Sequence, residues 1–331
     1  MKAAAFALFV VLLTVSAVAY RSRADLRERS AARGLLELMR RADAERDYQA
    51  IAEASFWSAQ GRQTATVQVF HRHPNQRLLR YGERYAFGCD GEREWTFDAK
   101  KRLAAYTPGP PLPKVWQRDL DLLEANYIIR TNGAQSIAGR AGVAVELNPR
   151  QMGRPRVKLV VDRETGVALA QEQFDGEGRL LSSTVLKSLD LAARPAAMLF
   201  DPPVHPKECR PDCTPMSRDS MARVLGFAFS MPSRLPAGFR EDSYAVYQCD
   251  RHDGCSLRAA MATFTDGLDQ LTVFETRPPH VGCGESRDEQ LFARFGAGAV
   301  AHIRRGQLRV VVVGGLPESE LRQVAESVAA Q

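Results

Sequence analysis

The chain has 331 residues, of which 45% are hydrophobic and 25% are charged. This composition excludes an intrinsically disordered chain, and the length predicts two domains. The net charge of +6 comes from arginines spread along the whole chain, with no run of five basic residues. A nucleic-acid partner is therefore not expected, whereas contact with an anionic membrane surface or an acidic partner stays open.

Residues 1–20, MKAAAFALFVVLLTVSAVAY, predict a secretory signal peptide. One lysine precedes a long apolar run, and the small residues Ala17 and Ala19 flank Val18 just before Tyr20. The alternative is an uncleaved membrane anchor, because the run is almost long enough to span a bilayer and positive charge follows it at residues 21 and 23. No cysteine lies near the cleavage site, so a lipid-anchored protein is not expected.

Six cysteines favour disulfide chemistry in an oxidising compartment. Their positions are Cys89, Cys209, Cys213, Cys249, Cys255 and Cys283. The sequence separation makes Cys249–Cys255 and Cys209–Cys213 the candidate bridges, and it leaves the pairing of Cys89 and Cys283 open. A zinc site that uses His205 or His252 is the weaker alternative, because the spacings differ from those of common zinc ribbons. We expect no metal and no cofactor.

Residues 30–195 predict one helix followed by antiparallel strands. Apolar residues recur at helical spacing in residues 29–46, and alternating strands follow at 48–57 and 64–72, joined by a polar turn. Three short strands are expected in residues 76–107, a proline-rich loop at 108–113, a short helix at 114–125 and two strands at 126–150. A meander ends the domain, with strands 156–162, 166–174 and 178–189. Such a sheet covers its inner face by curling round a helix, as in a half-open barrel.

Residues 194–220 contain six prolines and no periodicity, which predicts an extended linker. Residues 221–331 predict several strands and a closing helix, with Pro317 at its start. The predicted fold class is therefore α+β. A curved antiparallel half-barrel over helices is followed by a smaller α+β domain.

No catalytic constellation is visible in the chain. It has six histidines but no H-E-x-x-H pattern and no G-x-S-x-G nucleophile elbow. Asp162 and Glu164 occupy a turn that ends at Gly166, which explains them without chemistry. We therefore expect a binding protein and not an enzyme.

Several segments in both domains form a distinctive series. In the first domain they are YIIRTNGAQSIAGRAGVAVELNPR, VDRETGVALAQEQFDGEGRLL and the FHR at residues 70–72. In the second domain they are LPAGFR, FTDGLDQLTVFE and VVVVGGLPESELRQVAESV. Together these segments resemble the RseB/MucB family of sigma-E regulatory proteins. The N-terminal domain of that family shares its fold with the periplasmic lipoprotein carriers LolA and LolB. The cysteines in and around the second domain, and the linker HPKECRPDCTP, depart from the family pattern.

The resemblance implies a periplasmic regulator. Such proteins bind the periplasmic part of a membrane-spanning anti-sigma factor, shield it from the first protease of a cascade, and release it on a lipidic envelope-stress signal. The first domain would supply an apolar cavity inside the curved sheet, and the second most of the partner contact. The aromatic candidates for the cavity wall are Phe56, Phe70, Tyr81, Tyr85, Phe87, Trp95, Phe97 and Trp116.

Two other readings stay open. One is a lipoprotein or lipid carrier of the LolA/LolB type, which would leave the second domain with only an assisting role. The other is a membrane-anchored envelope protein, which would follow if residues 1–20 are not cleaved. The sequence does not decide whether the protein forms a homodimer.

Overall fold

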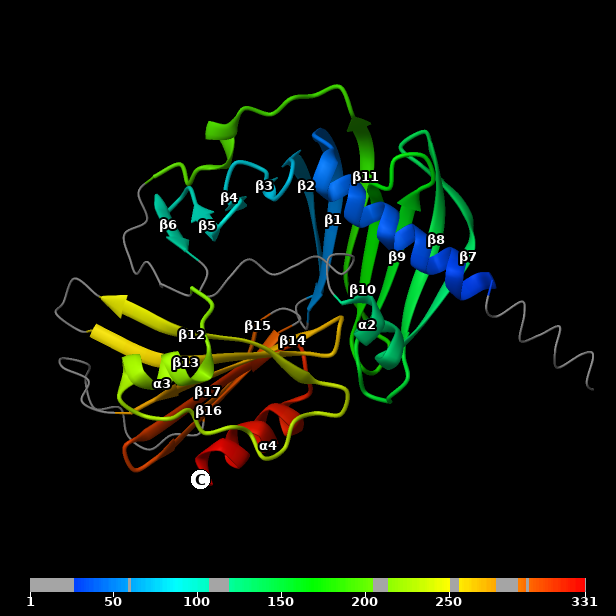
Figure 1. Cartoon of the computed structure of the whole chain (residues 1–331). Helices are drawn as coiled ribbons and strands as arrows, with labels where there is room; N and C mark the ends of the chain where they lie inside the picture. The colour runs from blue at the N-terminus through cyan, green and yellow to red at the C-terminus, as the bar shows by residue number, and fades with distance from the viewer. Residues whose placement is uncertain are drawn as a thin grey trace, which may run out of the picture.

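A computed structural model describes residues 27–58, 61–106, 119–204, 214–250, 256–277, 291–295 and 298–330. The predicted signal peptide lies outside these ranges. The chain forms two antiparallel sheets, one of 11 strands and one of six (Figure 1). Among the described segments, no helix combines the length and the apolar character that crossing a bilayer requires.

The larger sheet is a half-barrel whose strand order is β6-β5-β4-β3-β2-β1-β11-β10-β9-β8-β7. Strand β1 pairs with both β2 and β11, so the last strand of the domain returns beside the first. Strands β6 and β7 remain as unjoined edges, which makes the barrel half open. The strands are β1 (Tyr48–Ser58), β2 (Gly61–Arg72), β3 (Gln76–Tyr81), β4 (Tyr85–Asp90), β5 (Glu94–Asp98), β6 (Leu103–Tyr106), β7 (Tyr127–Ile137), β8 (Arg140–Pro149), β9 (Arg156–Asp162), β10 (Ala168–Phe174) and β11 (Leu180–Asp190).

The predicted helix occupies residues 27–45 and lies across the half-barrel (Figure 1). Its buried positions Ala32, Leu36 and Met39 recur at helical spacing and pack against β7, β8 and β9. A second, short helix, α2 (Leu120–Asn126), joins the same core. Only the last part of the helix predicted at 114–125 falls within the described residues.

Strand β2 shows which face of the sheet carries the N-terminal helix. The buried His71 places Nε2 3.0 Å from Asp43 Oδ1 of that helix and donates from Nδ1 to the carbonyl of Arg46 at 2.9 Å. Because neighbouring residues of a strand point to opposite faces, Phe70 lies on the other side of the sheet. We call these two sides the helix face and the outer face.

The hairpin formed by β9 and β10 docks onto the N-terminal helix. Asp162 Oδ1 accepts hydrogen bonds from the backbone N–H groups of Glu164 and Thr165, at 2.9 and 2.8 Å. Gly166 follows with φ of 80°, and a Cβ at this position would lie 2.5 Å from the carbonyl oxygen of Leu38. The turn is therefore built for close approach to the helix, which agrees with the structural role predicted for Asp162.

Two details of the first domain differ from the prediction. Four short strands, β3 to β6, occupy residues 76–106, where three were expected. The β1–β2 hairpin also has a tighter turn, because both strands extend further than predicted, to Ser58 and from Gly61. The polar residues at the end of this hairpin belong to the paired strands, because their side chains remain exposed to solvent.

The segment after β11 returns to the half-barrel. A single 3-10 turn, η2 (Ala197–Phe200), lies against β3 and β4 on the outer face. Phe200 is fully buried there, and Trp95 Nε1 donates to its carbonyl oxygen at 2.8 Å. This part of the predicted linker is thus packed on the sheet, because Phe200 is a large apolar side chain in an otherwise polar and proline-rich run.

The second domain is a six-stranded sheet in the order β12-β13-β14-β17-β16-β15 with two helices. Helix α4 packs its apolar stripe, Leu321, Val324 and Val328, against the sheet. The predicted closing helix and the predicted α+β class are confirmed. The elements are α3 (Arg218–Leu225), β12 (Arg240–Asp250), β13 (Ser256–Thr265), β14 (Gln270–Thr276), β15 (Leu291–Phe295), β16 (Gly298–Arg305), β17 (Leu308–Gly314) and α4 (Glu318–Ala329).

Candidate functional site

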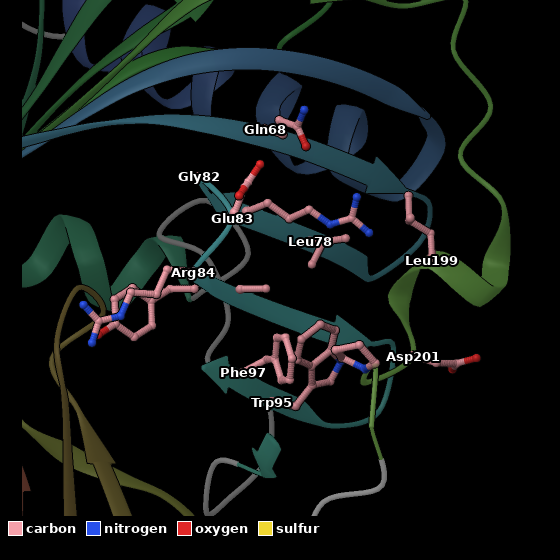
Figure 2. A pocket seen from close by; sticks show the side chains of 13 residues that line it. Gln68, Leu78, Gly82, Glu83, Arg84, Trp95, Phe97, Leu199 and Asp201 are labelled. Atoms are coloured by element: carbon pink, nitrogen blue, oxygen red, sulfur yellow. The ribbon is translucent and has the colours of Figure 1, made fainter. Parts of the chain in front are cut away.

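A pocket of about 390 Å³ lies on the outer face of the half-barrel, between β2–β5 and the segment after η2 (Figure 2). This volume falls in the range of about 300–1,000 Å³ that is usual for small-molecule sites. The sheet supplies most of the wall, and Leu199 closes it from the linker side. The lining residues are Gln68, Leu78, Arg80, Gly82, Glu83, Arg84, Tyr85, Ala86, Trp95, Phe97, Leu199, Asp201 and Pro203.

The apolar end of the pocket depends on Trp95. Its indole lies over Gly88 of the neighbouring strand, where a Cβ would come within 2.2 Å of the ring. The ring is buried with Phe70, Leu78 and Phe200. Figure 2 shows Phe97 beside it. A glycine in the middle of a strand thus makes room for the largest side chain of the wall.

The open end of the pocket is polar. The guanidinium of Arg80 lies 5.4 Å from the centroid of Phe70, and that of Arg84 lies 4.6 Å from the centroid of Tyr85. Glu83 and Asp201 add two carboxylates, and Asp201 projects outward in Figure 2. The lining is therefore balanced in charge, with an apolar floor below a polar rim.

Three other aromatic candidates gather on the helix face. The rings of Phe56 and Tyr81 are 6.1 Å apart, and those of Tyr81 and Phe87 are 5.4 Å apart. Phe56 is 43% exposed and Phe87 is 45% exposed, which is unusual for two large apolar side chains in contact with one aromatic neighbour. We call these three residues the helix-face aromatic group.

The eight candidates for a cavity wall are therefore not brought together. Tyr85, Trp95 and Phe97 line the outer pocket, and Phe70 packs behind it. The helix-face aromatic group lies on the opposite side of the sheet, and Trp116 lies outside the described residues. Strand alternation separates Trp95 and Phe97 from Tyr81 and Phe87, because side chains on one wall must share the same parity in register. Tyr85 lies opposite Tyr81 and shares the parity of Phe87, and it borders the outer pocket from the end of β4.

The contact between the two domains contains residues that the sequence analysis did not identify. Tyr127 is buried and donates from Oη to Asp266 Oδ2 at 2.8 Å. Burial, together with the charge of Asp266, raises the pKa of Tyr127 well above its usual value, so the hydroxyl stays a donor. Arg154, which is 6% exposed, forms an ion pair with Glu320 of α4 at 2.8 Å. No local pattern marks these residues, since each partner lies more than 100 positions away in the chain.

The cysteine predictions remain largely untested. Cys89 is buried in β4. The side chain of Cys249 and all of Cys209, Cys213, Cys255 and Cys283 lie outside the described residues. In the part of the chain that is described, no group of three His, Cys, Asp or Glu side chains could hold a metal ion.

Comparisons with known proteins give the same family for both domains. Residues 31–211 match the MucB/RseB N-terminal domain, and residues 227–329 match the MucB/RseB C-terminal domain. No curated protein sequence matched the chain.

Solved structures share this fold. The complex of Pseudomonas aeruginosa MucA/MucB aligns with a TM-score of 0.56 at 19% identity, covering 89% of this chain and 97% of the matched chain. A crystal structure of MucB aligns with a TM-score of 0.55 at 19% identity, covering 90% of this chain and 97% of the matched chain. A structure of MucB with MucA(peri) gives a TM-score of 0.55 at 20% identity, covering 89% and 97%. The two-domain architecture is therefore that of MucB.

Proposed function

Because the chain belongs to the MucB/RseB family, we propose that it is a periplasmic regulatory protein that binds the periplasmic part of a membrane-spanning anti-sigma factor. The observation that carries this proposal is the match of both family domains, in order, across residues 31–211 and 227–329. The similar MucB structures include complexes with MucA and with MucA(peri), which supports a partner of that kind. Bound in this way, the protein shields the anti-sigma factor from proteolysis.

Export to the periplasm is part of this proposal. The signal peptide predicted at residues 1–20 supports it, and we propose cleavage after Ala19. In that oxidising compartment we propose bridges Cys249–Cys255 and Cys209–Cys213. Peptide mapping of the purified protein without reductant tests the pairs, and free thiols at these four positions would contradict them.

Partner binding is tested with the mature chain that begins at Tyr20. Calorimetric titration with the periplasmic segment of a single-pass anti-sigma factor from the same organism should give a defined complex. The bound segment should also be cut more slowly by the protease that makes the first cleavage. An equally long periplasmic segment from an unrelated single-pass protein is the control. Absence of both binding and protection would refute the proposal.

We further propose that the half-barrel takes up an acyl chain as the release signal. The helix-face aromatic group supports this, because Phe56 and Phe87 expose large apolar surface on the inner side of the curved sheet. The outer pocket, with Trp95 and Phe97, is the other candidate position. The two lie on opposite faces, so one acyl chain cannot fill both.

Matched substitutions on neighbouring strands separate these positions. Phe87→Ala removes a ring from the helix face, and Phe97→Ala removes one from the outer pocket. Loss of most of the contact made by one phenyl ring weakens binding of a fluorescent C12 fatty acid about tenfold. We expect this loss in Phe87→Ala and near wild-type binding in Phe97→Ala. The reverse result would indicate that the acyl chain binds in the outer pocket. If the fatty acid does not bind to the wild-type protein, the lipid signal is excluded.

A lipid or lipoprotein carrier of the LolA/LolB type is the alternative, and the exposed helix-face aromatic group favours it. The second domain distinguishes the two functions, because a carrier does not need it. Mass spectrometry of material bound to the mature protein in envelope extracts decides between them. An anti-sigma factor released by added lipid indicates the regulator, whereas lipid or acylated lipoprotein alone indicates the carrier.

A further inference from the structure

The short helix α2 touches three parts of the molecule at once. It lies between the N-terminal helix, the half-barrel and the second domain (Figure 1). Its buried residues Leu120 and Leu123 share one apolar core with Leu36 of the N-terminal helix and with Leu268 of the second domain. The core of the first domain is therefore completed by a side chain from the second.

Ionic contacts hold α2 to the N-terminal helix. Arg33 Nη1 lies 2.8 Å from Asp121 Oδ1 and 3.1 Å from Glu124 Oε1. The same guanidinium pairs with Glu37 of its own helix through Nε at 3.2 Å. One side chain thus ties both helices together.

Polar contacts hold α2 to the second domain. Asn126 Nδ2 donates to the carbonyl oxygens of Gly238 and Asp266, at 3.0 and 2.9 Å. Asp119, which caps the start of α2, is paired with Arg240 of β12. Both ends of this helix are therefore bonded across the domain boundary.

The turn that α2 contacts in the second domain is tightly built. Asp266 is buried, and its Oδ1 accepts from the backbone N–H groups of Leu268 and Asp269, at 2.9 and 2.7 Å, while Oδ2 accepts from Tyr127. Gly267 has φ of 95°, and a Cβ there would lie 2.6 Å from the backbone nitrogen of Leu123. The turn joins β13 to β14 in the interior of the six-stranded sheet, so its position is transmitted directly to that sheet.

From these contacts we propose that α2 couples the N-terminal helix to the second domain. Displacement of the helix by a ligand on the helix face would then loosen the turn at residues 266–269, and a partner that fixes the second domain would hold the helix in place. The role of ligand and partner rests on the function proposed above, whereas the mechanical coupling does not. Coupling of this kind is reciprocal by thermodynamic necessity.

The coupling is tested by amide hydrogen exchange on the ligand-free mature protein. Arg33→Met removes the tie between the two helices and does not alter any contact of the second domain. We expect it to speed exchange of the 266–269 turn about fivefold or more, the lower end of usual coupling. Tyr127→Phe keeps the ring and removes the bond to Asp266, and it should speed exchange in residues 27–45 to a similar degree.

Two control variants make the same chemical changes away from α2. Arg322→Met breaks an ion pair within α4, and Tyr244→Phe removes a hydroxyl that bonds Glu241 within the second domain. Neither should alter exchange in residues 27–45, and strands β3–β5 serve in all four variants as an internal reference for global unfolding. The proposal is overturned if Arg33→Met leaves exchange of the 266–269 turn unchanged, or if Tyr127→Phe leaves exchange in residues 27–45 unchanged.

A second measurement separates this inference from the proposed function. In the wild-type protein, an acyl ligand that releases the partner should weaken partner affinity, and Tyr127→Phe should reduce that effect while each ligand still binds alone. Hydrogen exchange can show coupling between the N-terminal helix and the 266–269 turn while lipid and partner bind independently of each other. That result would refute release of the partner by lipid and would leave the mechanical coupling supported. If release persists unchanged in Tyr127→Phe, the signal does not pass through the bond between Tyr127 and Asp266 at the end of α2.

Discussion

Replacement of Asp162 by asparagine isolates the charge that holds the β9–β10 hairpin. The carboxylate is 1% exposed and pairs with Arg140, while one of its oxygens also accepts two backbone hydrogen bonds from the turn. Asparagine keeps an oxygen for those two bonds but turns its NH2 group, a donor, toward the guanidinium in place of the charged oxygen. Charge-assisted hydrogen bonds contribute about 1.5–3 kcal/mol. Arg140 keeps Glu164 as a partner at 3.0 Å, so we expect a loss of about 2 kcal/mol.

The loss is measured by thermal unfolding followed through tryptophan fluorescence. All three tryptophans belong to the first domain, at residues 57, 95 and 116, so the signal reports on that domain. For a domain of this size, about 2 kcal/mol corresponds to a decrease in Tm of about 4–8 °C.

The pH dependence gives an independent check on the charge. Burial alone would raise the pKa of Asp162. The ion pair with Arg140 and the two backbone N–H groups outweigh this effect of burial, so the pKa of Asp162 lies below its usual value. The ionised carboxylate therefore stabilises the fold above the unfolded-state pKa of about 3.9, and this stability is lost as the pH falls through the lower folded-state value. The difference between wild type and Asp162→Asn should be constant from neutral pH down to about pH 5 and should shrink below about pH 4.

Asp175→Asn is the matched control for this prediction. Asp175 caps the β10–β11 turn, also accepts two backbone hydrogen bonds, and pairs with Arg179, whose side chain is 63% exposed. An exposed pair of this kind contributes about 0–1 kcal/mol, so Tm should fall by no more than about 4 °C. Equal losses in the two variants, or a loss in Asp162→Asn that does not depend on pH, would refute the argument from buried charge.

Three further substitutions test other parts of the structure. Gly88→Ala places a methyl group against the indole of Trp95. It should therefore destabilise the first domain by about 1–3 kcal/mol and shift tryptophan emission to the red. Unchanged emission would contradict this packing of Trp95. Gly267→Ala should push the turn at residues 266–269 away from α2 and so uncouple the unfolding of the two domains. Calorimetry should then record two unfolding transitions in place of one. A single transition at the wild-type temperature would show that the domain contact is loose. Arg277→Met leaves the fully buried Glu275 without its cation. Urea unfolding should then show that the free energy of unfolding of the second domain is lower by about 3–5 kcal/mol. A loss below about 1 kcal/mol would contradict a stabilising role of this ion pair.

The elements of the fold were largely predictable because each one is a local pattern. The helix is predicted by the spacing of Ala32, Leu36 and Met39, and the turn is predicted by Asp162 and Gly166. Each pattern involves only residues that are close to one another in the sequence. The short strands β3 to β6 were undercounted because strands of four to six residues separated by tight turns leave little alternation to count.

The aromatic candidates could be found but not sorted by sequence alone. Phe87 and Trp95 both occupy strand positions, yet they face opposite sides of the sheet, because Gly88 and not Phe87 pairs with Trp95. Which residues share a face depends on the register between strands, and register is fixed by turn lengths that a hydrophobicity pattern does not give. Phe200 was missed for a related reason, since a single buried side chain in a proline-rich segment has no periodicity.

The domain contact contains polar bonds that are unfavourable to break one at a time. Its central bonds join Tyr127 and Asn126 to Asp266, and a second pair joins the buried Arg154 to Glu320. Breaking one of them alone leaves a buried polar group without its partner, which costs more than the bond contributes when it is made. Partly opened arrangements are therefore disfavoured relative to both the closed and the fully hydrated states. The polar bonds therefore favour a closed contact or a fully separated one, and the apolar contact of Leu268 with Leu120 and Leu123 adds to the stability of the closed one.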